Sequence, residues 1–288
     1  MINPETIRHA SEMACLLEAS AEKPGNVTPT HAFHDMCFED FLHSAVAIGP
    51  EIAQAGTRGV GQTILAAIQA TKRWVRPNTN LGIVLLLAPL ARAALQYPSE
   101  VLSSKILRAQ LHRVLNELTV DDARAAYAAI RLAVPGGMNE PVEAHDVRTE
   151  VPTVTLHAAM ALAAQRDSIA SEYVTDYAIV FERCLPAYQA ALAQGLSEPA
   201  AVLQTYLQTL AVVPDTLIAR KADWSAAESV SAQAAAIVAN GGVTTDSGRL
   251  AIAQFDTYLR ANGNRLNPGT TADLMSATLF VAQLHILP

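Results

Sequence analysis

The sequence predicts an all-α protein in which residues 1–288 form a single domain of about ten or more helices. Three observations lead to this prediction. Hydrophobic residues make up 51% of the chain but aromatic residues only 5%, because alanine and leucine, both strong helix formers, dominate. Apolar residues recur with the 3.6-residue period of a helix along nearly the whole chain. No segment alternates like a strand, and no fixed repeat or linker-like tract divides the chain.

The helices expected in the first half of the chain end where glycine and proline interrupt the apolar pattern. Residues 7–17 carry one apolar face, and the Pro24-Gly25 pair ends this first helix. A second helix begins near Phe38 and stops at Gly49-Pro50. Further helices in this half are expected at residues 59–74, 78–95, 100–117 and 120–133.

An irregular segment separates the two halves. Residues 134–152 hold three prolines and two glycines, and they form either an active-site loop or a simple connector. Beyond this segment the helical period returns. Helices are expected at residues 153–165, 168–193, 198–212, 225–239, 244–261 and 271–285.

Charge, hydropathy and cysteine content argue against several classes of protein. A net charge of −7 argues against nucleic acid or an anionic membrane as the main partner. The most apolar run, residues 81–95, is too short to span a bilayer and contains Pro89 and Arg92, so it predicts a buried central helix. The three cysteines are far apart and form no CxxC pair. A zinc or disulfide framework is therefore not expected, and the reducing cytoplasm is the expected compartment.

The familiar nucleotide-binding motifs do not occur. The chain has no GxxxxGK[ST] and no GxGxxG that follows a strand. Residues 56–63, "GTRGVGQT", lead into a helix whose N-terminus could face an anion, but an ordinary turn explains them better.

Polar interruptions at helix ends are the more informative feature. They are "KPGNV" (23–27), "HDM" (34–36), "RPNTNLG" (76–82), "VPDTLIARK" (213–221) and "LNPGTTADL" (266–274). Such joints present free backbone N–H groups at the positive end of a helix dipole. They carry four cations and three carboxylates: Lys23, Arg76, Arg220, Lys221, Asp35, Asp215 and Asp273. Carboxylates of this kind can hold Mg²⁺ together with phosphate oxygens, so the joints predict a pocket for a Mg²⁺-polyphosphate.

The same joints carry a resemblance to a known family. The segments "EKPGNVTPTHAFHDMCFEDFLHSAVAIGP", "NTNLGIVLLLAPLARAAL", "VPDTLIARK" and "LNPGTTADLMSATLFVAQL" are similar, in the same order, to blocks of the triphosphoribosyl-dephospho-CoA synthase family. The resemblance covers nearly the whole chain. It implies an all-helical fold and an enzyme of cofactor biosynthesis that joins ATP to dephospho-CoA and releases adenine.

The resemblance implies a role for each joint. Asp35 and Asp215 are expected to be catalytic, and Asp35, Asp215 and Asp273 to hold Mg²⁺. The residues expected to bind the nucleotide are Lys23, Gly25, Asn26, Asn78, Thr79, Arg220, Lys221, Asn267 and Gly269. We expect these residues to meet in one cleft.

Local structure offers a competing interpretation of several of these residues. Lys23 could be a solvated lysine at a helix end. Asn78 and Asp215 stand where they could cap the helices that follow them. Asp273 completes a T-x-x-D capping box with Thr270. The sequence leaves both interpretations open.

Three positions depart from the better known members, which have histidine, histidine and lysine where this chain has Phe33, Asn80 and Leu81. The chain therefore resembles a divergent branch whose acceptor differs. ATP and a small acceptor, dephospho-CoA or a related cofactor precursor, are the expected substrates. The alternatives are a cofactor-assembly enzyme of a tetrahydromethanopterin-type one-carbon pathway or a non-catalytic nucleotide-binding protein. The sequence does not decide between a monomer and a homodimer.

Overall fold

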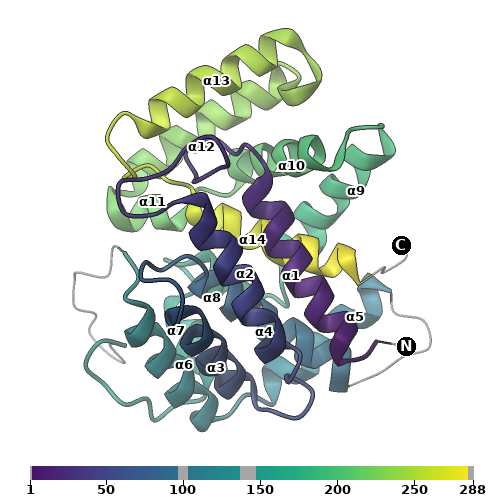
Figure 1. Ribbon diagram of the computed structural model, residues 1–288, viewed down its shortest axis with the longest axis vertical. Helices are drawn as coiled ribbons and strands as arrows, with labels where there is room; N and C mark the ends of the chain where they lie inside the picture. Colours follow the sequence, from purple (N-terminus) through teal and green to yellow (C-terminus); the bar gives the residue numbers. More distant parts are fainter. Residues whose placement is uncertain (1, 97–102, 137–146, 285–288) are drawn as a thin grey trace.

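The computed structural model describes residues 2–96, 103–136 and 147–284. These residues form fourteen α-helices, one π-helical segment and one 3-10 turn, with no strand among them (Figure 1). The all-α prediction is confirmed. In chain order the elements are α1 (Pro4–Ser20), α2 (Phe38–Ile52), α3 (Val60–Lys72), α4 (Leu81–Gln96), α5 (Ser104–Asn116), α6 (Val120–Ala133), α7 (Leu156–Ala163), α8 (Ser168–Val174), η1 (Val180–Cys184), α9 (Leu185–Ala193), α10 (Glu198–Val212), α11 (Thr216–Lys221), α12 (Trp224–Ala239), η2 (Gly242–Thr244), α13 (Asp246–Arg260) and α14 (Gly269–Gln283).

Two helices form the centre of the core. Nearly every residue of α4 is buried, as the apolar run of residues 81–95 predicted, and α14 is almost as deeply buried. The two helices pack against each other, and α14 also packs against α1 and α10. Figure 1 shows α14 crossing the middle of the molecule, with α10, α12 and α13 on one side and α3, α6 and α7 on the other. Among the described helices, none combines the length and the hydropathy needed to cross a bilayer.

A proline inside α4 is compensated from a distant helix. Pro89 has no N–H, so the carbonyl of Leu85 lacks its usual intrahelical donor. The hydroxyl of Tyr173 donates to that carbonyl at 2.7 Å, and the hydroxyl of Tyr177 donates to the carbonyl of Leu86 at 3.0 Å. Both tyrosines are fully buried. These bonds fix the segment around α8 against the central helix.

The prediction of one helix over residues 168–193 is wrong. Asp176 and Tyr177 have φ angles of 51° and 58°, which separate α8 from η1 and α9. The buried carboxylate of Glu172 accepts hydrogen bonds from the backbone N–H groups of Ile179 at 2.9 Å and Val180 at 3.0 Å. Glu172, in α8, therefore caps the start of the helical segment formed by η1 and α9. No proline or glycine marks the break between α8 and η1.

The predicted stop at Gly49-Pro50 is also wrong, because α2 continues to Ile52. Gly49 serves helix packing instead. A Cβ atom there would lie 2.2 Å from Oε1 of Glu12 on α1. Pro50 lies in the last turn, and Val46, whose carbonyl it leaves unpaired in the helix, is 57% exposed, so water can supply a donor.

The remaining expected helices are present, with ends shifted by a few residues. In the predicted irregular segment, residues 134–136 and 147–152 contain no helix, and residues 137–146 lie outside the described residues. The sequence "GTRGVGQT" forms a turn into α3. The N–H of Gly61, in the first turn of α3, donates to Oδ1 of Asp122 at 2.8 Å. That amide is therefore already satisfied by a protein carboxylate.

Candidate functional site

The polar joints meet at a single large cavity of about 1140 Å³. Its walls come from the loop before α2, the start of α4, helices α7 and α11, and the start of α14. The predicted site residues in its walls are Asn26, Asp35, Asn78, Thr79, Arg220, Lys221, Asn267, Gly269 and Asp273. The fold thus brings together residues that are as far apart in the sequence as Asn26 and Asp273. Lys23, Gly25 and Asp215 do not line the cavity.

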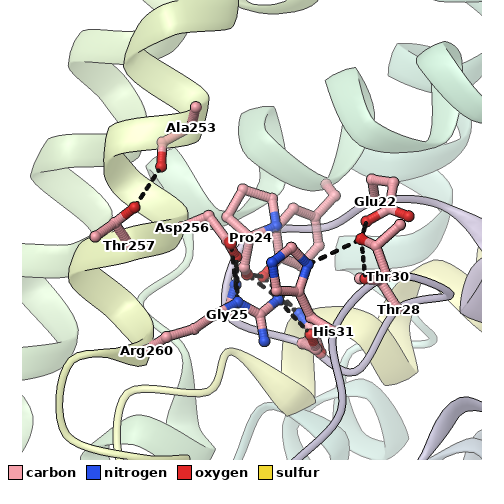
Figure 2. A network of polar contacts seen from close by, with 12 residues as sticks. Glu22, Pro24, Gly25, Thr28, Thr30, His31, Ala253, Asp256, Thr257 and Arg260 are labelled. Carbon is pink, nitrogen blue, oxygen red and sulfur yellow. Dashed lines mark hydrogen bonds and ion pairs between the residues drawn. The ribbon is translucent and has the colours of Figure 1, made fainter.

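The Pro-Gly turn after α1 is fixed on α13 (Figure 2). The N–H of Gly25 donates to Oδ1 of Asp256 at 2.8 Å, and Arg260 pairs with that carboxylate at 2.8 Å. Arg260 also donates to the carbonyl of Asn26 at 2.6 Å. Gly25 has a φ of 77°, and a Cβ atom there would lie 2.8 Å from Cδ1 of Leu259. Both the backbone conformation and the packing therefore require glycine at this position. The N–H of Gly25 is bonded to Asp256 and is not available to a ligand.

Lys23 lies inside the protein. Its side chain is 1% exposed, and Nζ lies 3.0 Å from Oε1 of Glu18. Nζ also donates to the backbone carbonyls of Glu18 and of Ala21, the latter at 3.2 Å. A lysine ammonium has three protons. These three acceptors use all of them, so Lys23 has no free N–H for a phosphate.

Asp215 is a structural carboxylate. One oxygen caps α11 by accepting from the N–H groups of Leu217 and Ile218 at 2.9 and 3.1 Å. The other accepts from the N–H and the hydroxyl of Thr271 on α14 at 2.7 and 2.8 Å. Burial raises the pKa of Asp215 above its ordinary value, although these four bonds oppose the shift. The side chain joins α11 to α14, as the capping interpretation expects.

Asp273 has the opposite environment. It lines the cavity and accepts no hydrogen bond from any residue in the described ranges. Its carboxylate lies against α4, where a Cβ atom on Gly82 would be 2.0 Å from Oδ2 of Asp273. Burial raises the pKa of Asp273 well above its usual range, and the nearby carboxylates of Glu18 and Asp215 add to the shift. The N-cap residue of α14 is Pro268, which makes no side-chain capping bond, so the predicted capping box of Thr270 and Asp273 does not form.

The start of α4 forms the part of the wall next to Asp273. Oδ1 of Asn78 accepts from the N–H of Leu81 at 3.1 Å, so Asn78 caps the helix. The hydroxyl of Thr79 lies 2.5 Å from that of Ser44, and the amide of Asn80 donates to the hydroxyl of Thr71 at 3.0 Å. Thr79 and Asn80 are therefore held by α2 and α3 while they line the cavity.

Basic side chains surround the cavity. They are Lys72, Arg76, Arg148, Arg166, Arg220 and Lys221. Arg220 pairs with Asp167, and Nζ of Lys221 donates to the carbonyl of Asn264 at 3.1 Å. Burial lowers the pKa of Lys221, and the nearby Asp35 partly offsets this. This concentration of cations is unusual in a chain with a net charge of −7, and it favours an anionic ligand.

Comparison with known proteins identifies the family. A sequence model of the family described as ATP:dephospho-CoA triphosphoribosyl transferase matches residues 4–287. The chain belongs to this family. A crystal structure of a protein from Archaeoglobus fulgidus, named triphosphoribosyl-dephospho-CoA synthase, is similar with a TM-score of 0.63. The two are 22% identical, and the match covers 84% of this chain and 97% of that one. The structural likeness supports the fold, and the family match makes this chain a triphosphoribosyl transferase of cofactor biosynthesis.

The size and lining of the cavity suit a two-substrate transferase. Its volume of about 1140 Å³ exceeds the roughly 300–1,000 Å³ typical of a site for one small ligand. ATP and dephospho-CoA are the substrates of the family. The wall also contains large apolar and aromatic residues, which include Phe33, Met36, Phe41, Tyr127, Ile130, Leu156 and Met160. One cavity can therefore hold a polyphosphate and a second, partly apolar molecule.

The predicted three-carboxylate metal site does not form. Within the described part of the chain, no group of three or more histidine, cysteine, aspartate or glutamate side chains is arranged to hold a metal ion. Asp215 is excluded as a ligand because four protein donors occupy its two oxygens. Of the three predicted ligands, Asp35 and Asp273 line the cavity.

Sequence reasoning missed several residues of the site. Glu18 lines the cavity although it lies at the end of α1, where the pattern suggested only a helix surface. Lys72, Arg148 and Arg166 were missed for the same reason, because they stand outside the polar joints. Lys72 and Arg166 lie near the ends of α3 and α7, and Arg148 lies within the irregular segment of residues 134–152, which was the only available signal.

Proposed function

We propose that the chain transfers the triphosphoribosyl group of ATP to a hydroxyl of a second substrate and releases adenine. The acceptor oxygen bonds to the anomeric carbon of the ATP ribose as the bond to adenine breaks. The transition state has oxocarbenium character, as in glycoside hydrolysis. The observation that supports this most strongly is the pairing, in one large cavity, of many cations with a carboxylate, Asp273, that no described group hydrogen-bonds.

The triphosphate is assigned to the basic part of the cavity. Arg220 and Lys221 follow each other at the end of α11, and Arg166 precedes α8 close to the partner of Arg220, Asp167. Arginine and lysine bind phosphates through charge-assisted hydrogen bonds. We propose that these three side chains clamp the phosphates, and that Asn26 and Asn267 contact the nucleoside. Oδ1 of Asn267 supports this role, because it is buried and has no hydrogen-bond partner among the residues that the structure describes.

Asp273 is the proposed general base. A base must be free to accept a proton from the acceptor hydroxyl, and its pKa should lie near the working pH. No residue in the described ranges donates a hydrogen bond to Asp273, and burial raises its pKa well above that of an ordinary aspartate. Asp215, which the sequence also suggested as catalytic, has both oxygens engaged.

Magnesium fits the site through few protein ligands. Mg²⁺ commonly binds one or two carboxylates and completes its shell with phosphate oxygens and water. Asp35 meets this requirement, because it lines the cavity and is 49% exposed, with His34 at 3.6 Å as its nearest ion-pair partner. When bound, the ion would neutralise charge on the triphosphate.

The acceptor is proposed to be dephospho-CoA or a related cofactor precursor that is less anionic. Phe33 lines the cavity where better known members carry histidine, and Leu81 replaces a lysine. An acceptor phosphate near these positions would lose two counter-charges. The three free cysteines and the family's place in cofactor biosynthesis favour the cytoplasm as the site of action.

The decisive experiment follows adenine release. The protein is incubated with ATP, Mg²⁺ and dephospho-CoA, and binding of MgATP is measured separately by calorimetry. We expect MgATP to bind, and adenine to appear only with an acceptor present, below about 1 s⁻¹ for dephospho-CoA. Absence of MgATP binding would refute the proposed function. Turnover of dephospho-CoA at or above that rate would refute only the proposal that the acceptor is less anionic than dephospho-CoA.

A further inference from the structure

We propose that Glu18 is a catalytic carboxylate that stabilises the positive charge of the ribosyl transition state, and that buried Lys23 positions it. This inference rests on the proposed function and adds two roles to it. Lys23 was expected to bind the nucleotide, and no role was expected for Glu18. In the structure Glu18 lines the cavity, and Lys23 lies behind it, outside the cavity wall.

The first observation is the burial of the pair. The Glu18 side chain is 4% exposed and the Lys23 side chain 1%, and their charged atoms are 3.0 Å apart. A buried ion pair loses much of the hydration of both charges, so it is weak evidence of added stability. A pair kept at the wall of a cavity therefore needs another explanation, and an oriented carboxylate supplies one.

The second observation is the orientation of the pair. Every proton of the Lys23 ammonium is directed to Glu18 or to the backbone beside it. Lys23 contacts Oε1 of Glu18, and within the described ranges no other group donates to this carboxylate. Lys23 is not in the cavity wall, whereas Glu18 is. The carboxylate is thus anchored from behind and open toward the ligand.

The third observation concerns the second carboxylate. Glu18 is close enough to Asp273 to raise its pKa. The two carboxylates therefore suit different roles. Glu18, which Lys23 holds in place, suits a fixed negative charge, and Asp273, which no described residue hydrogen-bonds, suits a base. A fixed charge in a site that excludes water stabilises a developing cation more strongly than solvent does. Displacement at the anomeric carbon develops such a cation.

The reaction step balances without a further reactant. The acceptor hydroxyl gives its proton to Asp273 as its oxygen bonds to the anomeric carbon. The bond from that carbon to adenine breaks, adenine leaves with the electron pair, and it takes a proton from solvent. Glu18 forms no bond in this step, because it only faces the carbon and ring oxygen while they carry positive charge.

The experiment uses two probes that do not require turnover. An iminoribitol 5′-triphosphate carries a cationic ring nitrogen, and a 1,4-anhydroribitol 5′-triphosphate is its neutral counterpart. The wild-type protein is expected to bind the cationic probe at least about tenfold more tightly, as transition-state mimics do. In Glu18→Gln this preference should disappear, while the affinity for MgATP stays within a factor of about two.

A double variant separates catalysis from folding. Lys23→Met alone leaves Glu18 buried without a partner, so it should lower the melting temperature. Glu18→Gln combined with Lys23→Met restores a neutral pair, so its melting temperature should return toward the wild-type value. It should still lack the preference for the cationic probe. Glu22→Gln is the matched control, since Glu22 is exposed and binds Thr30 at 2.8 Å outside the cavity.

Two results would overturn the inference. One is a double variant that retains the preference for the cationic probe. The other is a wild-type protein that binds MgATP and both probes without preferring the cation. Failure of the wild type to bind MgATP would instead refute the proposed function itself.

Discussion

Asp215 is buried and Asp273 is partly buried at the same end of α14, yet their surroundings are opposite. Asp215 accepts four hydrogen bonds and links α11 to α14. Asp273, two residues beyond the threonine that Asp215 binds, accepts none from the described residues and faces the cavity. A carboxylate whose lone pairs are filled by the protein contributes to stability. One left without donors at a cavity wall is available for a ligand, at a cost in stability.

The largest effect is expected from Asp273→Asn. Removing a general base lowers the turnover rate by about 10²–10⁴-fold. Affinity for MgATP should change little, because the asparagine keeps the shape of the side chain. Adenine release under saturating substrates, together with calorimetric titration of MgATP, measures both quantities. Activity close to that of the wild type would remove Asp273 from the reaction.

The same variant sharpens the comparison through its pH dependence. The folded-state pKa of Asp273 is raised, so the protonated acid is favoured in the folded protein. Its contribution to stability is complete below the unfolded pKa and is lost as pH rises through the folded pKa. Asp273→Asn should therefore be more stable than the wild type at neutral pH, by an amount that shrinks in acid. Urea unfolding at several pH values tests this.

Asp215→Ala is expected to give the next largest effect, on stability. The change removes both oxygens from four buried donors, so the free energy of unfolding should fall by about 3 kcal/mol or more. Asn3→Ala is the control, because Asn3 caps α1 at an exposed site through Thr6, and such a cap contributes about 1 kcal/mol. If Asp215→Ala kept wild-type stability and lost MgATP binding, the structural assignment would be wrong.

Arg220→Met tests the phosphate end of the cavity. Loss of a charge-assisted phosphate contact costs about 1.5–3 kcal/mol, which is roughly a 10–100-fold weaker Kd for MgATP. Arg249→Met removes an exposed arginine of α13 that binds the carbonyl of Val243 at 2.8 Å, and it should leave that Kd unchanged. Equal losses in the two variants would point to a general effect of net charge.

Glu172 extends the comparison to a third carboxylate, which is fully buried. Burial raises its pKa to about 7, although two backbone N–H groups lower it. Protonation is favoured in the folded state, so stability is expected to fall as pH rises from about 4.5 to 7. The slope contributed by one group is at most about 1.4 kcal/mol per pH unit. Glu172→Gln should lose this slope, whereas Glu198→Gln, at a part-buried bond to Tyr188, should keep it.

Most of the fold follows from the sequence alone. Periodic apolar residues and the scarcity of aromatic residues determine that the chain is helical, and the unbroken run at residues 81–95 determines which helix lies at the centre. These are local properties, because the period of a helix and the cost of burying a polar face act within a few residues. Most helix ends that proline or glycine causes can also be predicted from the sequence.

Other features depend on partners that are distant in the sequence. The break between α8 and η1 arises from the carboxylate of Glu172 and has no proline or glycine to reveal it. The turn at Gly25 is held by Asp256, 231 residues away. No pattern within one helix records such a contact, since the two residues meet only after the chain has folded.

The candidate site divides in the same way. The joints at residues 76–82, 213–221 and 266–274 are visible in the sequence because their polar residues interrupt apolar helices. Residue type alone could not distinguish Asp215 from Asp273, or predict that Lys23 would point into the protein and Glu18 into the cavity. Whether a polar group is bonded by the protein or left open to a ligand depends on which donors the tertiary structure brings within 3 Å.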